Sequence, residues 1–294
     1  MHNNIINYDS PLSIKKYLDE HKMCAQKKFG QNFLISHTAR QRLIDALDFQ
    51  PDDPVWEVGP GLGAVTSLLL ECRAHVTAFE LDRGFCQSLK EFFGSEDNFT
   101  LVEGDFLKTF RQQPNLPDFI LGNLPYNIAA TLIAGLIESG FFFKRSVFTV
   151  QKETAARMCA KAGTKDYSSL SVLCASHYDV SQICILGGAQ FYPPPNVDSA
   201  CVLFRQLPDS MQKQIPQFFY KLVRSLFANR RKTVQNNLAV FLSHNSNIIT
   251  ANQQLKITAA DILAKANIKI TERAENLNLE SFLRIAEVLE KNFY

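Results

Sequence analysis

The sequence predicts an α/β fold with a mostly parallel sheet, followed by a smaller all-α C-terminal domain. Two observations lead to this prediction. Apolar runs of strand length alternate with helix-like segments as far as residue 204, whereas the apolar spacing from residue 205 onward is that of helices alone. The first of these strands is also followed by a glycine-rich turn and a helix, which is the order found in the nucleotide-binding half of a doubly wound fold.

Length and composition fit one large globular domain, or one domain plus a smaller one. The 294 residues include 46% hydrophobic and 20% charged residues, which is enough for a sizeable core and argues against wholesale disorder. Seven cysteines are scattered without a C-x-x-C pair, which indicates reduced thiols in a cytosolic protein rather than disulfides or a zinc site. No signal-peptide core and no long uncharged apolar stretch is present, so neither secretion nor membrane insertion is indicated.

The chain begins with a polar extension, residues 1–26, that contains a short predicted helix at 14–18. Lys27 and Lys28 follow directly before an aromatic residue, and such lysines can contact phosphate groups. Asn32 can hydrogen-bond a carboxylate or a hydroxyl group of a ligand. From the spacing alone, however, the favoured interpretation of this stretch is an ordinary loop that leads into the next helix.

After a predicted helix at 38–47 comes the first strand of the sheet, at 55–58. Gly59 and Gly61 open the turn that follows it, and glycines let the backbone turn tightly and approach a ligand closely. An apolar helix at 65–70 completes the unit. The spacing is G-x-G-x-G rather than G-x-G-x-x-G, which weakens the case for a dinucleotide.

The second predicted strand, at 75–79, ends in Glu80. Glu80 lies 21 residues after Gly59, close to the interval of roughly 20 residues that separates a glycine loop from a ribose-binding acid. A carboxylate at this position can accept hydrogen bonds from both ribose hydroxyls. The alternative is an acid that merely stabilises the N-terminus of the next helix.

Two further strands also end in polar residues. The strand at 99–103 is followed by Asp105, which can accept a hydrogen bond from an adenine amino group, and the strand at 119–122 leads directly into Asn123. Because the carboxyl ends of parallel strands meet at one edge of a sheet, we expect these side chains to lie near Glu80 and the glycine turn.

Asn123-Leu124-Pro125-Tyr126 is the stretch around which we interpret the rest of the chain. The Asn123 oxygen and the Leu124 carbonyl, which Pro125 keeps out of a helix, can accept two N–H bonds from the amino group of a flat base. Tyr126 can stack on the ring of that base. The alternative is a turn with a buried tyrosine that connects the strand to the helix predicted at 128–137.

Later strands complete the predicted sheet. A fifth is expected at 146–150, and the strands at 180–186 and 200–204 are expected to close the sheet as a pair around the loop at 193–195. Three consecutive prolines stiffen that loop.

The C-terminal part of the chain is basic. Residues 205–294 contain 13 Lys/Arg and 7 Asp/Glu, a net charge of +6, whereas residues 1–204 carry a net charge of −4. This asymmetry suggests a nucleic-acid contact, with a solvated helix surface as the alternative. A predicted helix with Phe219, Leu222 and Leu226 on one face is surrounded at its end by basic residues, and the last predicted helix lies near 279–289. These basic residues are Arg224, Arg230, Arg231 and Lys232. On a continuing helix the last three would span roughly 200°, too much for all of them to face one partner.

Together these motifs resemble those of class I S-adenosylmethionine-dependent methyltransferases, and more narrowly those of the small-subunit rRNA adenine N6,N6-dimethyltransferases. Each motif alone is a weak signal, but their combination is specific. The matching stretches are Lys28–Leu34, Glu57–Gly63, Glu80–Asp82, Gly104–Asp105, Asn123–Tyr126, Gln151–Glu153, Tyr167–Val172, Phe191–Asp198 and Arg230–Thr233. Residues 1–26 lie outside the resemblance.

The resemblance implies a Rossmann-like class I methyltransferase sheet, mostly parallel with one antiparallel strand. It implies a polar extension at 1–26, a catalytic domain at 27–205 that binds S-adenosylmethionine, and a helical RNA-binding domain at 206–294. The expected substrates are two adjacent adenosines in a hairpin near the 3′ end of small-subunit rRNA, within the small ribosomal subunit or its precursor. We expect a cytoplasmic monomer that contacts no membrane.

The resemblance also implies roles for individual residues, with S-adenosylmethionine as methyl donor and no metal. The residues expected to bind the donor are Asn32, Leu34, Gly59, Gly61, Glu80, Asp105 and Asn123. Those expected around the target adenine are Asn123, Leu124, Pro125, Tyr126 and Phe191, although Phe191 can instead be a packed residue that anchors the proline loop. Those expected to contact RNA are Lys27, Lys28, Arg224, Arg230, Arg231 and Lys232.

Three other functions remain as alternatives. A nicotinamide oxidoreductase is disfavoured by the glycine spacing and by the lack of a recognisable hydride-transfer site. The combination of Gly59, Glu80 and Asn123 disfavours a purely structural RNA-binding or ribosome-assembly factor, although a dual role remains compatible with it. Leu124 and the basic C-terminal region disfavour a DNA adenine methyltransferase.

Overall fold

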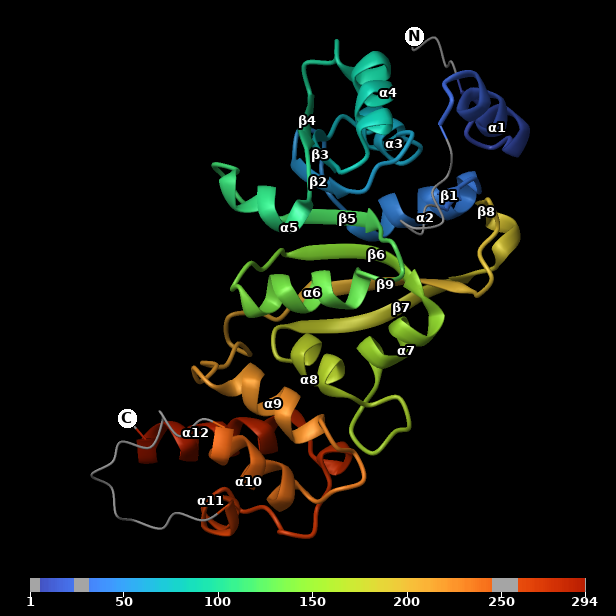
Figure 1. Ribbon diagram of the computed structural model, residues 1–294. Coiled ribbons are helices and arrows are strands. Elements are labelled where there is room, and N and C mark those ends of the chain that lie inside the picture. The colour runs from blue at the N-terminus through green and yellow to red at the C-terminus, as the bar shows by residue number, and fades with distance from the viewer. Residues whose placement is uncertain (1–5, 24–31, 245–258, 294) are drawn as a thin grey trace. The chain divides into compact units, whose positions relative to one another are not determined.

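The computed structural model describes residues 6–23, 32–244 and 259–293, and it divides into two compact units (Figure 1). We call residues 1–155 and 180–206 the sheet unit, and residues 156–179 and 207–294 the helical unit. This division differs from the predicted domain boundary, because residues 156–179 group with the C-terminal helices rather than with the sheet.

The sheet unit contains the mixed sheet that the sequence predicts. Its strand order is β4-β3-β2-β5-β6-β9-β7, in which β2 to β6 are parallel and β9 runs antiparallel to β6. The predicted class I methyltransferase sheet is therefore confirmed, with β7 and β9 adjacent at one edge (Figure 1). The strands are β2 (Pro54–Val58), β3 (His75–Glu80), β4 (Phe99–Glu103), β5 (Phe119–Asn123), β6 (Arg145–Gln151), β7 (Tyr178–Leu186) and β9 (Ser199–Gln206).

Helices connect and cover these strands. Several begin at a residue whose side chain caps the helix, as Ser36 caps α2 and Asp82 caps α4 by accepting backbone N–H bonds. The helices of this unit are α1 (Pro11–Glu20), α2 (His37–Leu47), α3 (Thr66–Glu71), α4 (Arg83–Phe93), α5 (Phe106–Thr109), α6 (Ala129–Glu138) and the start of α7 (Lys152–Cys159).

The two faces of the sheet bury different kinds of side chain, because successive strand residues point to opposite faces. On one face an aliphatic cluster joins Val55 and Val76 to Leu43 of α2 and Leu69 of α3. On the other face Trp56 packs edge-on against aromatic rings, and the rings in contact with it are Phe79, Phe106 and Phe143. Since both faces are covered, the carboxyl edge of the strands is the part of the sheet that remains open to a ligand.

A second, two-stranded sheet forms at this carboxyl edge, and the sequence did not predict it. Strand β1 (Phe33–Leu34) pairs antiparallel with β8 (Phe191–Tyr192), which places Leu34 opposite Phe191. The pairing joins segments more than 150 residues apart, so neither shows its strand character locally.

The helical unit has its own core. Helix α9 buries Phe219, Leu222 and Leu226, as predicted from their spacing, and α12 buries Phe282 and Leu283. The helices of this unit are the end of α7, α8 (Ser169–Ala175), α9 (Phe219–Phe227), α10 (Val234–His244), α11 (Ala259–Lys265) and α12 (Leu279–Phe293). In the part of the chain that the structure describes, no helix is both long enough and apolar enough to cross a bilayer.

Candidate functional site

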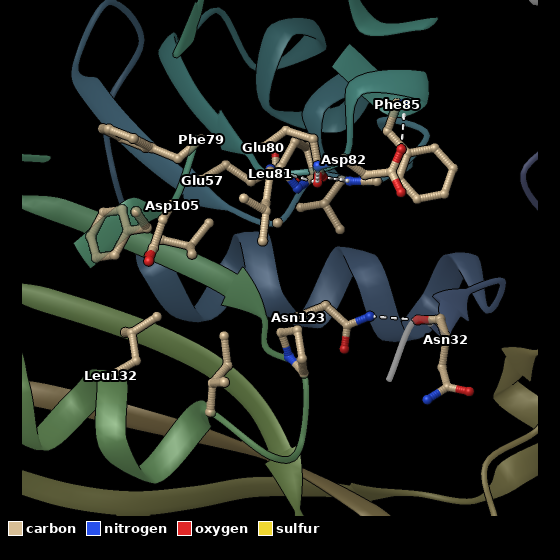
Figure 2. Close-up of a pocket in the computed structure, with 18 of the residues that line it drawn as sticks. Asn32, Glu57, Phe79, Glu80, Leu81, Asp82, Phe85, Asp105, Asn123 and Leu132 are labelled. Atoms are coloured by element: carbon tan, nitrogen blue, oxygen red, sulfur yellow. Dashed lines mark hydrogen bonds between the residues drawn. The ribbon is translucent and has the colours of Figure 1, made fainter. Parts of the chain in front are cut away.

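A cavity of about 560 Å³ opens at the carboxyl ends of β2, β3 and β5 and just beyond that of β4. These parallel strands lie side by side, and the chain leaves β2 and β5 in opposite directions across the sheet, which is the position where open α/β sheets bind ligands. The predicted donor residues Asn32, Leu34, Gly59, Gly61, Glu80, Asp105 and Asn123 all line this cavity. Figure 2 shows Glu80 and Asp82 on one side of it and Asn123 on the other.

The glycine turn forms the floor of the cavity next to β2. Gly59 and Gly61 have φ angles of +70° and +59°, a region that side chains with a Cβ disfavour. The Gly61 N–H donates a 3.1 Å hydrogen bond to Oε2 of Glu80. The turn after β2 and the acid after β3 are therefore held together before any ligand binds.

Glu80 is almost fully buried, with 6% of its surface exposed. Its Oε1 accepts hydrogen bonds of 2.8 Å from the N–H groups of Leu81 and Asp82. Burial nevertheless dominates, and it raises the pKa of Glu80 from 4.5 to about 7. The backbone donors fix the carboxylate in place, so it can present its remaining acceptor positions to a ligand hydroxyl.

Glu57 is a cavity residue that the sequence interpretation missed as a functional candidate. It lies in β2 with 2% of its surface exposed, and its Oε2 accepts a 2.6 Å hydrogen bond from the Thr66 hydroxyl. Burial, and to a smaller extent the charge of Glu80, raise the pKa of Glu57 to about 7. A charged residue within an otherwise apolar strand was the signal that could have identified it.

Asp105 stands just after β4, where it caps α5 by accepting a 3.0 Å bond from the Leu107 N–H. Together with Glu57, Glu80 and Asp82 it makes the cavity strongly acidic. Among the described residues that line the cavity there is no lysine or arginine. Such a site favours a ligand with cationic groups and disfavours the pyrophosphate of a dinucleotide.

Apolar side chains form the rest of the cavity wall. The most exposed of the large ones are Leu81 and Ile128, with 57% and 42% of their surfaces exposed. A mostly apolar lining with a few fixed polar groups is typical of a binding site for a small molecule. The sequence interpretation did not single out the following lining residues: Phe33, Phe79, Leu81, Phe85, Phe106, Leu107, Ile128, Thr131 and Leu132.

Asn123 ends β5, and its amide is oriented by a long-range bond. Its Nδ2 donates a 2.8 Å hydrogen bond to the carbonyl oxygen of Asn32, as Figure 2 shows. Because a carbonyl can only accept, this bond fixes which end of the amide is the nitrogen. The Oδ1 of Asn123 is left as an acceptor at the cavity.

The residues after Asn123 occupy different positions. Pro125 lines the cavity, whereas Leu124 is buried and Tyr126 is half-buried, and neither of these lines it. The Leu124 N–H bonds to the Thr149 carbonyl, and no described residue donates to the Leu124 carbonyl. The Tyr126 hydroxyl is 2.5 Å from Oγ of Ser199 on β9, which fixes its ring.

Phe191 does not line the cavity. With 2% of its surface exposed, it belongs to the same aliphatic core cluster as Leu34, its partner across the β1–β8 pair. This placement corresponds to the alternative interpretation, in which Phe191 anchors the proline loop. Leu34 lines the cavity, but only 3% of its surface is exposed, because most of its side chain packs in the core.

The basic residues of the helical unit lie on a turn rather than on a helix. Helix α9 ends at Phe227, and Arg230, Arg231 and Lys232 lie in the connection to α10. They therefore lie beyond the end of the helix rather than on a continuation of it. Asn237 explains the ending, because its buried Nδ2 donates to the carbonyls of Leu226 and Asn229 at 2.7 and 3.1 Å.

These basic residues also differ in their surroundings. Arg230, Arg231 and Lys232 are all exposed, and Arg230 is in addition tied to Oε2 of Glu275 at 3.0 Å and donates to the carbonyl of Lys165. Arg224 is exposed on α9. The other two predicted RNA contacts, Lys27 and Lys28, lie outside the described residues.

Comparisons with known proteins agree with this geometry. Residues 23–291 match the model of the family described as ribosomal RNA adenine dimethylase. Ribosomal RNA small subunit methyltransferase A of Treponema denticola is 41% identical over 288 residues, which are 96% of each chain. The protein of the same name from Borreliella burgdorferi is 40% identical over 284 residues, covering 97% of this chain and 95% of its own length.

A solved structure is also similar. The crystal structure of a dimethyladenosine transferase from Plasmodium falciparum superimposes with a TM-score of 0.74 at 28% identity. The match covers 88% of this chain and 98% of that chain, so both the sheet and the helical parts have counterparts there.

Proposed function

Because the chain belongs to the ribosomal RNA adenine dimethylase family, we propose that it is an S-adenosylmethionine-dependent rRNA dimethyltransferase. Its reaction places two methyl groups on N6 of each of two adjacent adenosines in a hairpin near the 3′ end of small-subunit rRNA. The acidic cavity at the carboxyl edge of the sheet, with the Asn123 amide at its rim, is the observation that carries this proposal.

The cavity suits S-adenosylmethionine in charge and in shape. The donor has a sulfonium and an ammonium group, which the carboxyls of Glu57, Glu80 and Asp105 attract, and a flat adenine that the apolar wall accommodates. Glu80 binds the ribose hydroxyls, because its oxygens are fixed acceptors at the end of β3. When bound, the donor supplies a methyl group on a positively charged sulfur.

Asn123 and Leu124 orient the nucleophile. The lone pair of an adenine amino group is delocalised into the ring, which makes it a poor nucleophile. Two acceptors, Oδ1 of Asn123 and the Leu124 carbonyl, take the two N–H groups and draw the nitrogen towards a tetrahedral geometry aimed at the methyl group. The ring of Tyr126 stacks on the unstacked base, and the released proton passes to water.

The turn after α9 contributes to docking on rRNA. Arg231 and Lys232 project from a segment that Asn237 and the Arg230–Glu275 pair hold in place. Cationic side chains on a fixed turn can contact phosphates with little loss of conformational freedom. Such contacts increase affinity for RNA without choosing a base sequence.

The substrate context follows from the relatives' names and the resemblance. We place the reaction in the cytoplasm, on the small ribosomal subunit or its precursor, with a monomeric enzyme. No cluster of metal-ligating side chains occurs within residues 6–23, 32–244 and 259–293, and the direct transfer proposed here uses no metal.

The test is methyl transfer from S-adenosylmethionine carrying a labelled methyl group to small subunits that lack the modification. Mass mapping of the rRNA should locate two dimethylated adenosines next to each other near the 3′ end. Large subunits and fully modified small subunits are the controls. Label on a cytosine, on large-subunit rRNA, or on protein alone would contradict the proposal.

A further inference from the structure

The N-terminal segment, residues 6–23, is packed against the donor cavity from outside. The family model matches from residue 23 onward, so all but the last residue of this segment lies before the matched region. Its side chains Ile14, Tyr17 and Leu18 are buried in one cluster with residues of three cavity-lining elements. Those residues are Phe33 of β1, Leu62 of the glycine turn and Phe85 of α4.

Tyr8 connects this segment to the glycine turn. Its hydroxyl donates a 2.8 Å hydrogen bond to the carbonyl oxygen of Leu62. Leu62 stands between Gly61, whose N–H binds Glu80, and Gly63. Burial raises the pKa of Tyr8, so its hydroxyl keeps its proton at neutral pH and remains a donor.

Asp9 connects the segment to β1 through Arg40. The Arg40 guanidinium is buried, with 3% of the residue exposed, and it lies 2.6 Å from Oδ1 of Asp9. Its other terminal nitrogen donates a 2.8 Å bond to the carbonyl of Leu34. A buried guanidinium needs a counter-charge, so the docked Asp9 keeps Arg40, and with it β1, in this position.

We propose that residues 6–23 are a positioning element of the donor site, in which Tyr8 and Asp9 hold the glycine turn and β1 in the conformation that binds S-adenosylmethionine. The proposal rests on the proposed function, because it assigns the same cavity to the same donor. Without the Tyr8 hydroxyl, the glycine turn can adopt other conformations that do not bind the donor. The apparent donor affinity then falls in proportion to the fraction of the protein whose turn is in the binding conformation. Tyr8 does not line the donor cavity, so its role there is to position the glycine turn.

The sharpest test is Tyr8→Phe, which removes one hydroxyl and keeps the ring in the cluster. Calorimetric titration with S-adenosylhomocysteine should show a dissociation constant raised about fivefold, the value of one hydrogen bond. In steady-state assays the KM for S-adenosylmethionine should increase, whereas the KM for the small subunit should not. Asp9→Asn should weaken donor binding in the same direction, because it removes the counter-charge of Arg40.

Tyr167→Phe is the matched control. The Tyr167 hydroxyl donates a 2.9 Å bond to the Leu277 carbonyl, the same kind of bond as that of Tyr8, but it lies in the helical unit. It should lower thermal stability by a similar amount without changing the affinity for S-adenosylhomocysteine. This separates an effect on the donor site from a general loss of stability.

The possible outcomes are distinct. If the wild-type protein binds S-adenosylhomocysteine and Tyr8→Phe binds it equally well, the positioning role is disproved while the proposed function stands. Equal weakening by Tyr8→Phe and Tyr167→Phe would also disprove it. If the wild-type protein does not bind S-adenosylhomocysteine at all, the proposed function itself fails.

Discussion

Substitution of Asn123 can distinguish a catalytic role of its side chain from a purely structural one. Replacement by alanine removes an acceptor that matters most in the transition state, so Asn123→Ala should lower the single-turnover methylation rate about 10²–10³-fold. The assay uses saturating donor and subunits, because the bond to Asn32 also supports the donor cavity. Asn115→Ala, an exposed asparagine outside the cavity, is the control. A rate within about threefold of wild type would show that Asn123 only braces the turn.

Glu80 predicts a pH dependence of donor binding. Its pKa of about 7 means that the carboxylate becomes protonated as the pH falls below 7, and a protonated carboxyl is a poorer acceptor for ribose hydroxyls. Donor affinity should therefore weaken between about pH 7.5 and pH 6, with proton release on binding. Glu80→Gln should bind about 10–100-fold more weakly, and the pH dependence should be flatter. Calorimetry in buffers of different ionisation enthalpy measures both quantities, and an unchanged pH profile would contradict the assignment.

The same group has the opposite effect on stability. Because burial raises the pKa of Glu80 from 4.5 to about 7, the folded protein takes up a proton before the unfolded chain does. Stability from this group is fully present below pH 4.5 and is lost as the pH increases through about 7. Glu57 acts in the same direction. Donor-free protein should therefore gain stability relative to Glu80→Gln as the pH falls from 7 to 5.

The residues of the site were predictable to different degrees, for physical reasons. Glu80, Asp105 and Asn123 follow predicted strands, and parallel strands must bring such positions to one edge, so their shared cavity could be predicted. Glu57 was missed because it lies inside a strand, where only the fold shows that it faces the cavity. The packing of Phe191 against the core depends on the long-range β1–β8 pair, which no local pattern indicates.

Among the elements, the glycine turn approaches α4 closely. A Cβ built on Gly63 would lie 2.4 Å from Cε2 of Phe93, and the φ angle of Gly63 is +85°. Gly63→Ala should therefore cost about 2–3 kcal/mol of stability, from backbone strain and from the clash. At Gly140 the φ angle is +75°, but no atom lies within 4 Å of a built Cβ. An alanine at this position would therefore cause backbone strain without a clash.

Gly140→Ala is therefore the matched control, with an expected cost of about 1 kcal/mol. Urea unfolding followed by circular dichroism measures both variants. The difference between the two losses in unfolding free energy measures the cost of the clash between the turn and α4. Equal losses would mean that α4 shifts freely and does not hold the turn.

Elements could be predicted where apolar residues recur locally. The parallel strands and helices α2, α6 and α9 match the sequence periodicity closely, because burial of one face or of both faces imposes it. Two-residue strands such as β1 and β8 are too short to carry a period. The residue that binds the last carbonyls of α9, Asn237, acts from the next helix, and the local pattern around α9 does not show it.

At the scale of the whole molecule, the chain order does not follow the compact units. Residues 156–179 interrupt the sheet sequence but pack with the C-terminal helices, as the Tyr167–Leu277 and Gly163–Glu275 hydrogen bonds show. A single domain boundary placed after the last strand therefore assigns residues 156–179 to the sheet, although they pack with the C-terminal helices. The loop before α8 consequently belongs to the same unit as the basic turn, where Arg230 binds the Lys165 carbonyl.

This arrangement predicts that RNA docking and donor binding can be changed separately. Replacement of Arg231 and Lys232 by alanine removes two exposed cations from the helical unit, so affinity for small subunits should fall and its salt dependence should flatten. The affinity for S-adenosylhomocysteine should not change, because neither residue lines the donor cavity. Binding measured across a range of salt concentrations gives the slope.

Lys15 and Lys16 provide the control for charge alone. They are adjacent exposed lysines on α1 of the sheet unit, so their double replacement by alanine changes the net charge by the same amount. If phosphates are contacted at the basic turn, only the Arg231/Lys232 variant flattens the salt slope, since that slope counts the phosphates neutralised at the interface. Equal slopes for the two double variants would mean that the basic turn is a solvated surface, and that the +6 charge of residues 205–294 acts only through the long-range field.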